Sequence, residues 1–175
     1  MGKVIFVVGR SGSGKTTICK KLEEIGFFRI SASEHLKKLY LSEFGSEPSR
    51  IQLANYGEML LLQNRLEGFH LGLETQIGNR DAVCVDGLRF KASVDELSKS
   101  LQRSLLIFLE CPPGVRESRS DTYVSRADFE ALGSHETEVS VDAMRASADL
   151  IIDASKPIAI AFRELENGLR GLQFI

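Results

Sequence analysis

The sequence of 175 residues predicts an α/β fold, in which helices cover both faces of a parallel sheet. Apolar runs rich in β-branched residues recur along the chain, and segments with helical spacing separate them. Strands that alternate with helices pair in parallel, because each connection has to cross over the sheet. Ligands of such sheets bind beyond the carboxyl ends of the strands, where we expect Gly9, Ser31, Asp86 and Glu110 to lie.

The patterns indicate each element in turn. The expected strands cover residues 3–8, 27–30, 82–86, 104–109 and 150–153. The expected helices cover residues 17–24, 34–42, 50–79, 91–101, 128–148 and 157–172. The segment 50–79 contains Gly57, Gly68 and Gly72 within an amphipathic pattern, so it is either one kinked helix or two. Gly133 marks a second expected break, within residues 128–148.

Residues 9–16 match the phosphate-binding pattern G-x-x-x-x-G-K-[ST], known as the P-loop. The match stands between an apolar strand and a helix, which is the context that the motif requires. Its glycines let successive N–H groups point inward around an anion, while the lysine reaches the β- and γ-phosphates and the threonine ligates Mg²⁺. The pattern predicts that ATP and Mg²⁺ bind here, through Gly9, Arg10, Ser11, Gly12, Ser13, Gly14, Lys15, Thr16 and Thr17.

The composition is typical of globular proteins. We expect a single domain over residues 1–175, because this length suffices for one core. The net charge of −2 gives no general attraction to nucleic acid, and no apolar run is long enough to span a bilayer. Cys19, Cys84 and Cys111 have no metal-ligand spacing, which favours reduced thiols in a cytoplasmic protein.

Three further stretches accompany the P-loop. Residues 83–86 run into the turn Gly87-Leu88-Arg89, residues 116–121 contain two arginines, and residues 148–153 precede the last helix. Together with the P-loop, they resemble the small, adenylate-kinase-like P-loop kinases of the nucleoside monophosphate kinase and dephospho-CoA kinase group. The resemblance implies a three-layer P-loop NTPase fold with a five-stranded sheet of order 2-3-1-4-5. It also implies a helical acceptor-binding segment at about 31–79 and a short lid at about 112–128.

The resemblance implies catalytic roles for Lys15, Asp86, Arg89, Arg116 and Arg119. Asp86 ends an apolar strand, and together with Thr16 it would organise Mg²⁺. If the acceptor is an alcohol, Asp86 is the best candidate for the base, whereas a phosphate acceptor is already ionised and needs none. Arg89 would bridge the transferring and accepting groups, and the other two arginines would neutralise charge in the transition state. The alternative is that these arginines are solvated surface groups.

Acceptor binding is expected from residues after the second strand and in the helical segment that follows. These residues are Ser31, Ser33, Glu34, Lys37, Arg50, Tyr56, Arg65 and Arg89. An aromatic ring together with cations suits a nucleobase and a phosphate. Ser31 and Glu34 also have capping-box spacing, which is the purely structural alternative. Adenylate kinases usually carry Thr-Gly-Asp where this chain has Ser31-Ala32-Ser33-Glu34, so the acceptor stays open.

The leading hypothesis is an ATP-dependent kinase that transfers the γ-phosphoryl group of MgATP to a nucleotide-like small molecule, first of all a (deoxy)nucleoside monophosphate. The alternative acceptor is an alcohol, either dephospho-CoA or a hydroxymethylated base in DNA, although the net charge does not favour DNA. The rival from another class is an ATP-binding regulatory module without transferase activity. An Asn-Lys-x-Asp motif, which GTPase switches need, is absent from the sequence. We expect a monomer or a homodimer.

Overall fold

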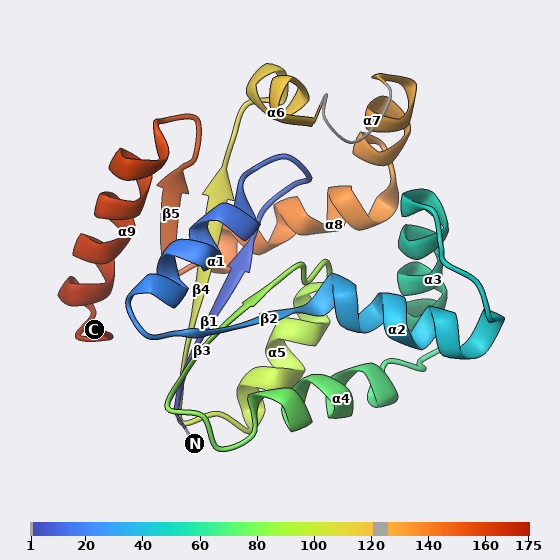
Figure 1. Cartoon of the computed structure of the whole chain (residues 1–175), viewed down its shortest axis with the longest axis horizontal. Coiled ribbons are helices and arrows are strands. Elements are labelled where there is room, and N and C mark those ends of the chain that lie inside the picture. The colour runs from blue at the N-terminus through green and yellow to red at the C-terminus, as the bar shows by residue number, and fades with distance from the viewer. Residues whose placement is uncertain (1, 121–125) are drawn as a thin grey trace.

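The computed structural model describes residues 2–120 and 126–175, and its sheet has the strand order that the sequence predicts. The strands are β1 (Lys3–Val8), β2 (Phe28–Ser31), β3 (Ala82–Asp86), β4 (Arg103–Glu110) and β5 (Leu150–Asp153). They pair in parallel in the order β2-β3-β1-β4-β5. The predicted α/β class and the order 2-3-1-4-5 are therefore confirmed, and the carboxyl ends of the strands lie toward the top of Figure 1.

The helices largely follow the predicted pattern. They are α1 (Lys15–Glu24), α2 (Ala32–Phe44), α3 (Arg50–Leu62), α4 (Glu67–Ile77), α5 (Lys91–Lys99), α6 (Pro113–Ser120), α7 (Arg126–Gly133), α8 (Glu136–Ala143), the 3-10 helix η1 (Met144–Ser147) and α9 (Ile158–Gly171). The segment 50–79 is two helices, and the chain turns between them at Asn64, whose φ is 54°. The break therefore does not occur at Gly57, Gly68 or Gly72, which all lie inside helices. The expected break after Gly133 separates α7 from α8.

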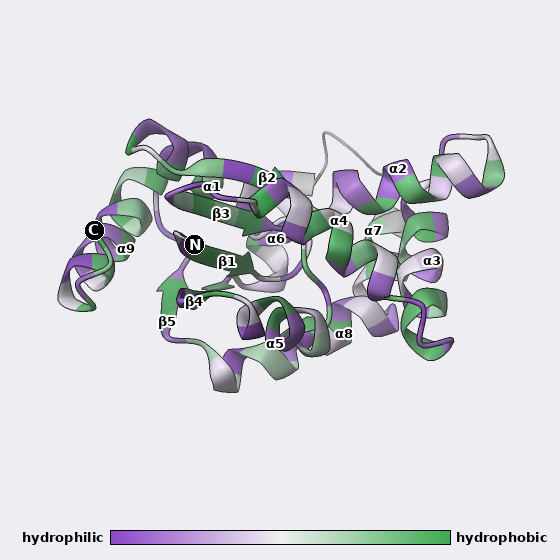
Figure 2. Ribbon diagram, turned by 90° about the horizontal axis from the view of Figure 1, so that it is seen from below, coloured by the Kyte–Doolittle hydropathy of each residue, from purple (hydrophilic) through white to green (hydrophobic). Residues whose placement is uncertain are grey.

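Two hydrophobic clusters cover the two faces of the sheet. Phe6 and Val8 of β1 face a cluster with α4, α5 and α8, whereas Ile5 and Val7 face a cluster with α1 and α9. The central strand is buried on both faces, which explains why its sequence is continuously apolar. Figure 2 shows β1 and β3 as strongly hydrophobic and the outer helices as mixed, so the three predicted layers are present.

The helices α2, α3 and α4 extend to one side of the sheet and form a helical lobe (Figure 1). Tyr40, Phe44 and Tyr56 pack together inside this lobe, with ring centroids 4.5 to 5.8 Å apart. The helix α8 joins the lobe to the sheet, because His135 at its N-terminus lies 2.8 Å from the side-chain oxygen of Asn55 in α3. Within the described ranges, no helix has the length and apolar character of a membrane span.

We expect Leu165→Ala to lower the free energy of unfolding by about 2–5 kcal/mol, because it leaves a cavity where α9 packs on the sheet. Leu165 is fully buried, whereas Leu172, just beyond the same helix, is 41% exposed. Leu172→Ala is therefore the matched control, with an expected change of about 0.5 kcal/mol or less. Denaturant unfolding measures both variants, and equal losses would contradict this packing.

Candidate nucleotide-binding and acceptor sites

The P-loop connects β1 to α1 at the carboxyl edge of the sheet. Gly9, Gly12 and Gly14 have φ angles of 150°, 78° and 90°, in the region that favours glycine. Gly9 also lies against β4, where a β-carbon would come within 2.8 Å of the carbonyl oxygen of Leu109. The helix α1 begins at Lys15 directly after the loop. The turn therefore has glycine where its backbone conformation and its contact with β4 require it.

The side chain of Lys15 folds back onto the loop. Its Nζ atom donates hydrogen bonds to the carbonyl oxygens of Gly9 and Arg10, at 2.7 and 2.9 Å. Burial lowers the pKa of Lys15 to about 7, and the positive charge of Arg89 lowers that pKa further, against the opposing effect of Glu138. The side-chain nitrogen of Lys15 is therefore held by two neutral carbonyl oxygens, which a phosphate group would replace.

Asp86 and Thr16 lie side by side at the end of β3. The Thr16 hydroxyl is 3.4 Å from Oδ2 of Asp86, and the same oxygen accepts hydrogen bonds of 2.9 and 3.1 Å from Arg29. Magnesium binds through one or two protein oxygens together with substrate phosphates and water. Thr16 and Asp86 fit that role, and no group of three or more His, Cys, Asp or Glu side chains in the described ranges forms a separate metal cage.

Two acids of α8 reach the first residues of the P-loop. Glu138 accepts a hydrogen bond of 2.7 Å from the main-chain N–H of Ser11, and its other oxygen pairs with Arg89. Asp142, one turn further along α8, accepts hydrogen bonds from Nε and Nη2 of Arg10, at 3.0 and 2.6 Å. Arg89, for which the sequence predicts a role in transfer, thus pairs with a carboxylate that was not identified from the sequence.

Arg116 and Arg119 lie on one face of α6, as their spacing predicts, and both contact main-chain carbonyl groups near the loop. Arg116 donates to the carbonyl oxygens of Ser11 and Cys111, at 3.3 and 3.1 Å. Burial, aided by the charge of Arg10, lowers the pKa of Arg116. Arg119 donates to the carbonyl oxygen of Ala154 at 2.7 Å. Both arginines therefore border the P-loop, while residues 121–125 of the predicted lid lie outside the described residues.

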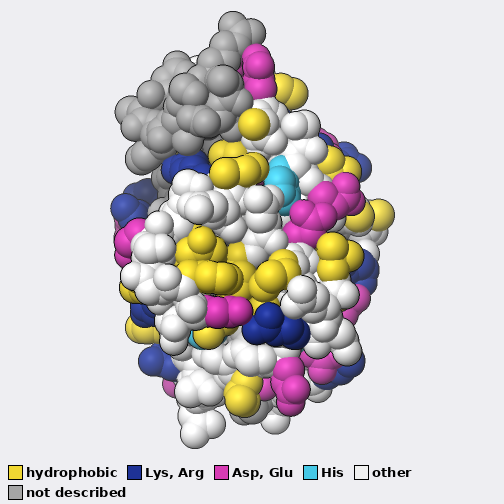
Figure 3. All heavy atoms as spheres, turned by 90° about the vertical axis from the view of Figure 1, so that its right-hand side faces the viewer, with side chains coloured by type: hydrophobic (Ala, Val, Ile, Leu, Met, Phe, Trp, Pro, Cys, Tyr) yellow, Lys and Arg dark blue, Asp and Glu magenta, His cyan; other side chains and the backbone are white. Residues whose placement is uncertain are grey.

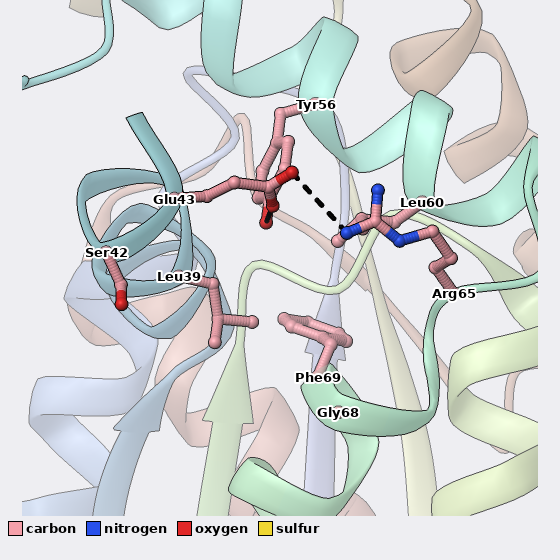
Figure 4. Close-up of a pocket in the computed structure, with 8 residues that line it drawn as sticks. All are labelled: Leu39, Ser42, Glu43, Tyr56, Leu60, Arg65, Gly68 and Phe69. Atoms are coloured by element: carbon pink, nitrogen blue, oxygen red, sulfur yellow. Dashed lines mark hydrogen bonds and ion pairs between the residues drawn. The ribbon is translucent and has the colours of Figure 1, made fainter. Parts of the chain in front are cut away.

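Tyr56 and Arg65 line a cavity of about 280 Å³ in the helical lobe (Figure 4). Its other lining residues are Leu39, Ser42, Glu43, Leu60, Gly68 and Phe69. The Tyr56 hydroxyl donates to Glu43 at 2.8 Å, and Arg65 approaches the other oxygen of Glu43 at 3.4 Å. Burial and the hydrogen bond to Glu43 raise the pKa of Tyr56 to about 12, so this hydroxyl remains a donor. The cavity therefore combines apolar walls with a polar end.

The remaining predicted acceptor residues do not line this cavity. Ser31 and Ser33 lie 3.1 Å apart at the start of α2, and Ser31 accepts a hydrogen bond from the N–H of Glu34 as an N-cap. Lys37 pairs with Glu47 at 2.6 Å. Arg50 is the first residue of α3. Of the expected set, Tyr56 and Arg65 are thus brought together, whereas the roles of the others stay predictions.

Arg29, Glu138 and Asp142 are the residues of this site that sequence analysis missed. Arg29 lies in β2, two residues before Ser31, which is aligned with Asp86 of β3. Glu138 and Asp142 are four residues apart and therefore on one face of α8. The i, i+4 spacing of these two acids is visible in the sequence, but their partners in the P-loop lie more than 120 residues away along the chain.

The sequence is similar to UPF0200 proteins and, over a shorter stretch, to adenylate kinases. No protein-family model matches it. A UPF0200 protein of Saccharolobus islandicus is 28% identical over 162 residues, which cover 86% of this chain and 83% of that protein. Adenylate kinase isoenzyme 1 of Rattus norvegicus is 25% identical over 120 residues, which cover 67% of this chain and 62% of that protein.

Solved structures of kinases share the fold. A gluconokinase from Sinorhizobium meliloti has a TM-score of 0.68 at 18% identity, and the match covers 98% of this chain and 93% of the gluconokinase chain. Shikimate kinase from Aquifex aeolicus has a TM-score of 0.60 at 14% identity, and the match covers 97% of this chain and 98% of the shikimate kinase chain. The chain therefore has the fold of small P-loop kinases, and the predicted resemblance to the adenylate-kinase-like group is confirmed.

We expect the binding of ATP at pH 8 to take up about one proton, because a pKa of about 7 leaves Lys15 mostly neutral in the free protein and a neighbouring triphosphate raises that pKa. The uptake should fall as the pH drops through 7, since Lys15 is then already charged. Calorimetric titration in buffers of different ionisation enthalpy measures the number of protons. Lys15→Arg, which stays charged, should bind with no comparable uptake, and an uptake independent of pH would contradict this assignment.

Proposed function

We propose that this chain is an ATP-dependent kinase that transfers the γ-phosphoryl group of MgATP to a nucleotide-like acceptor, first of all a (deoxy)nucleoside monophosphate. The observation that carries the proposal is the pairing of two sites in one chain. A P-loop with Asp86 beside Thr16 suits the donor, and an aromatic cavity in the helical lobe suits the acceptor. The comparisons support the kinase class, and the acceptor is our inference from the chemistry of the cavity.

Transfer in this proposal depends on position and charge. The loop N–H groups and Lys15 hold the β- and γ-phosphates, and Mg²⁺ supplies further charge neutralisation when it is bound by Thr16 and Asp86. Arg116 and Arg119 of α6 lie beside the loop, and Nη1 of Arg119 is 3.9 Å from the place of a β-carbon on Gly14. These arginines would turn from carbonyl oxygens to phosphate oxygens, which are stronger acceptors because they carry charge.

The cavity supports an acceptor with a flat heterocycle. The rings of Tyr56 and Phe69 and the side chains of Leu39 and Leu60 provide apolar walls on which a base can pack. Glu43 and Arg65 add an acceptor and donors of hydrogen bonds at the polar end. Figure 3 shows this side of the molecule, where both acidic and basic side chains lie near an apolar patch. A surface of mixed charge suits a small molecule better than DNA, which binds to basic surfaces.

The environment of Asp86 supports a phosphate rather than an alcohol acceptor. Its Oδ2 atom already accepts hydrogen bonds from Arg29 and Thr16, and the residue is 3% exposed. This oxygen therefore already has a guanidinium and a hydroxyl partner, and Thr16 lies where it can share a metal ion with the carboxylate. Asp86 is therefore better suited to organise Mg²⁺ than to deprotonate an alcohol, and a phosphate acceptor requires no base.

An alcohol acceptor is the second candidate, because the solved structures that cover nearly the whole chain include proteins named gluconokinase and shikimate kinase.

Consumption of ATP with Mg²⁺ against a panel of acceptors separates the candidates. The panel comprises ribo- and deoxynucleoside monophosphates, dephospho-CoA, gluconate, shikimate, and DNA with and without hydroxymethylated bases. We expect one monophosphate to stimulate ATP loss, and Lys15→Ala to abolish it while the protein stays folded. Stimulation by an alcohol alone would transfer the role of base to Asp86, and tight ATP binding without any stimulation would indicate a regulatory module.

We expect Arg65→Met to raise the KM for the stimulating acceptor by about tenfold, which corresponds to about 1.4 kcal/mol, while the Kd for ATP stays unchanged. The reason is that Arg65 lines the cavity and is absent from the loop site. Arg163→Met, at an exposed position of α9, removes the same charge and is the matched control. Steady-state kinetics and calorimetry provide the two constants, and an unchanged KM would place the acceptor elsewhere.

A further inference from the structure

Glu138 is a buried carboxylate among the donors of the P-loop site. It is 4% exposed. One of its oxygens accepts a hydrogen bond of 2.7 Å from the main-chain N–H of Ser11, and the other pairs with the guanidinium group of Arg89. Its negative charge also acts on Lys15 and Arg116. A single acid side chain thus receives donors from the loop and from the turn after β3.

The groups that surround Glu138 are those that bind phosphate in proteins. A P-loop N–H and an arginine are donors to phosphate oxygens, and Lys15 is the cation of the same motif. The Nη1 atom of Arg89 is buried, and it is the atom that forms the ion pair with Oε1 of Glu138. Glu138 therefore neutralises a buried arginine nitrogen that a phosphate group would also neutralise.

We propose that the carboxylate of Glu138 fills the subsite of the nucleotide's terminal phosphate in the free protein, and that a triphosphate has to displace it. The inference rests on the part of the proposed function that places a nucleotide at the P-loop, and it is independent of transfer. A carboxylate and a phosphate group are both anionic acceptors, so they compete for the single N–H of Ser11 and for the charge of the Arg89 guanidinium. A diphosphate lacks the terminal group and leaves Glu138 in place.

If Glu138 has to move first, it controls when the γ-phosphate reaches its binding position. Glu138 lies three residues after His135, which contacts Asn55 of α3 and lies 3.6 Å from Glu58. The helix that carries Glu138 is therefore attached to the helical lobe that contains the acceptor cavity. While Glu138 stays on Arg89, a terminal phosphate is held away from this arginine and is poorly placed to react with water.

If Glu138 instead has a positioning role, its removal changes the nucleotide affinity in the opposite direction. If Glu138 served only to position Ser11 and Arg89, its removal would loosen the site and weaken the binding of every nucleotide. If Glu138 competes with the terminal phosphate, its removal tightens the binding of a triphosphate and has little effect on a diphosphate. The sign of one affinity change therefore distinguishes the two roles.

Calorimetric titration of Glu138→Gln with Mg²⁺ and either ADP or the non-hydrolysable analogue β,γ-imido-ATP tests the proposal. We expect the analogue to bind about tenfold more tightly than to the wild type, and ADP to change by about twofold or less. Glu136→Gln removes the same charge from an exposed position of α8 and should change neither affinity by more than about twofold. Weaker binding of both nucleotides to Glu138→Gln, or no change, would overturn the proposal.

Hydrogen exchange of the wild-type protein is a second measurement, which does not depend on the folding of a variant. The analogue should increase amide exchange in residues 136–143 relative to ADP, because α8 loses the contact that Glu138 makes with the loop. Equal protection of α8 by both nucleotides would contradict displacement. Neither measurement requires an acceptor, so failure of the proposed transfer and failure of this inference give different results.

Discussion

The pairing of β1 with both β3 and β4 is the constraint on which the candidate site depends. In this register Val7 is aligned with Asp86 and Val8 with Phe108, so the P-loop leaves the sheet beside the ends of both neighbouring strands. The contact of Gly9 with the Leu109 carbonyl group, and that of Thr16 with Asp86, both follow from this alignment. Because β1 is buried on both faces, its position is set by two hydrophobic clusters rather than by the loop itself.

Paired charges surround the loop. Arg29 pairs with Asp86, Arg89 with Glu138, and Arg10 with Asp142. These arginines are only partly exposed, so the acids offset the cost of holding several cations close together around the loop. The pairs are not equivalent, since Asp86 lies on the Thr16 side of the loop and Glu138 on the side of Ser11. One acid therefore fits the metal side and the other occupies a place suited to phosphate.

The helical lobe and the loop site are separate in sequence but joined in space by α8. His135 contacts α3, Glu138 contacts the loop, and Val141 and Met144 extend into the core. The same short region thus touches the lobe with the cavity, the loop and the sheet. Under the proposed function, this arrangement would connect the cavity of the lobe to the phosphate site through one short helix.

The sequence by itself determined the α/β class, the P-loop and most element boundaries, because these depend on apolar periodicity and on residues adjacent in the chain. The break at Asn64 was less predictable, since three glycines in the same segment are better breakers by propensity and yet remain inside helices. Only the tertiary structure decided the partners of Arg29, Arg10 and Ser11, which lie 57, 132 and 127 residues away, and the cavity between three helices. The physical reason is that a side chain's partner across the fold depends on how whole elements pack, which local pattern does not encode.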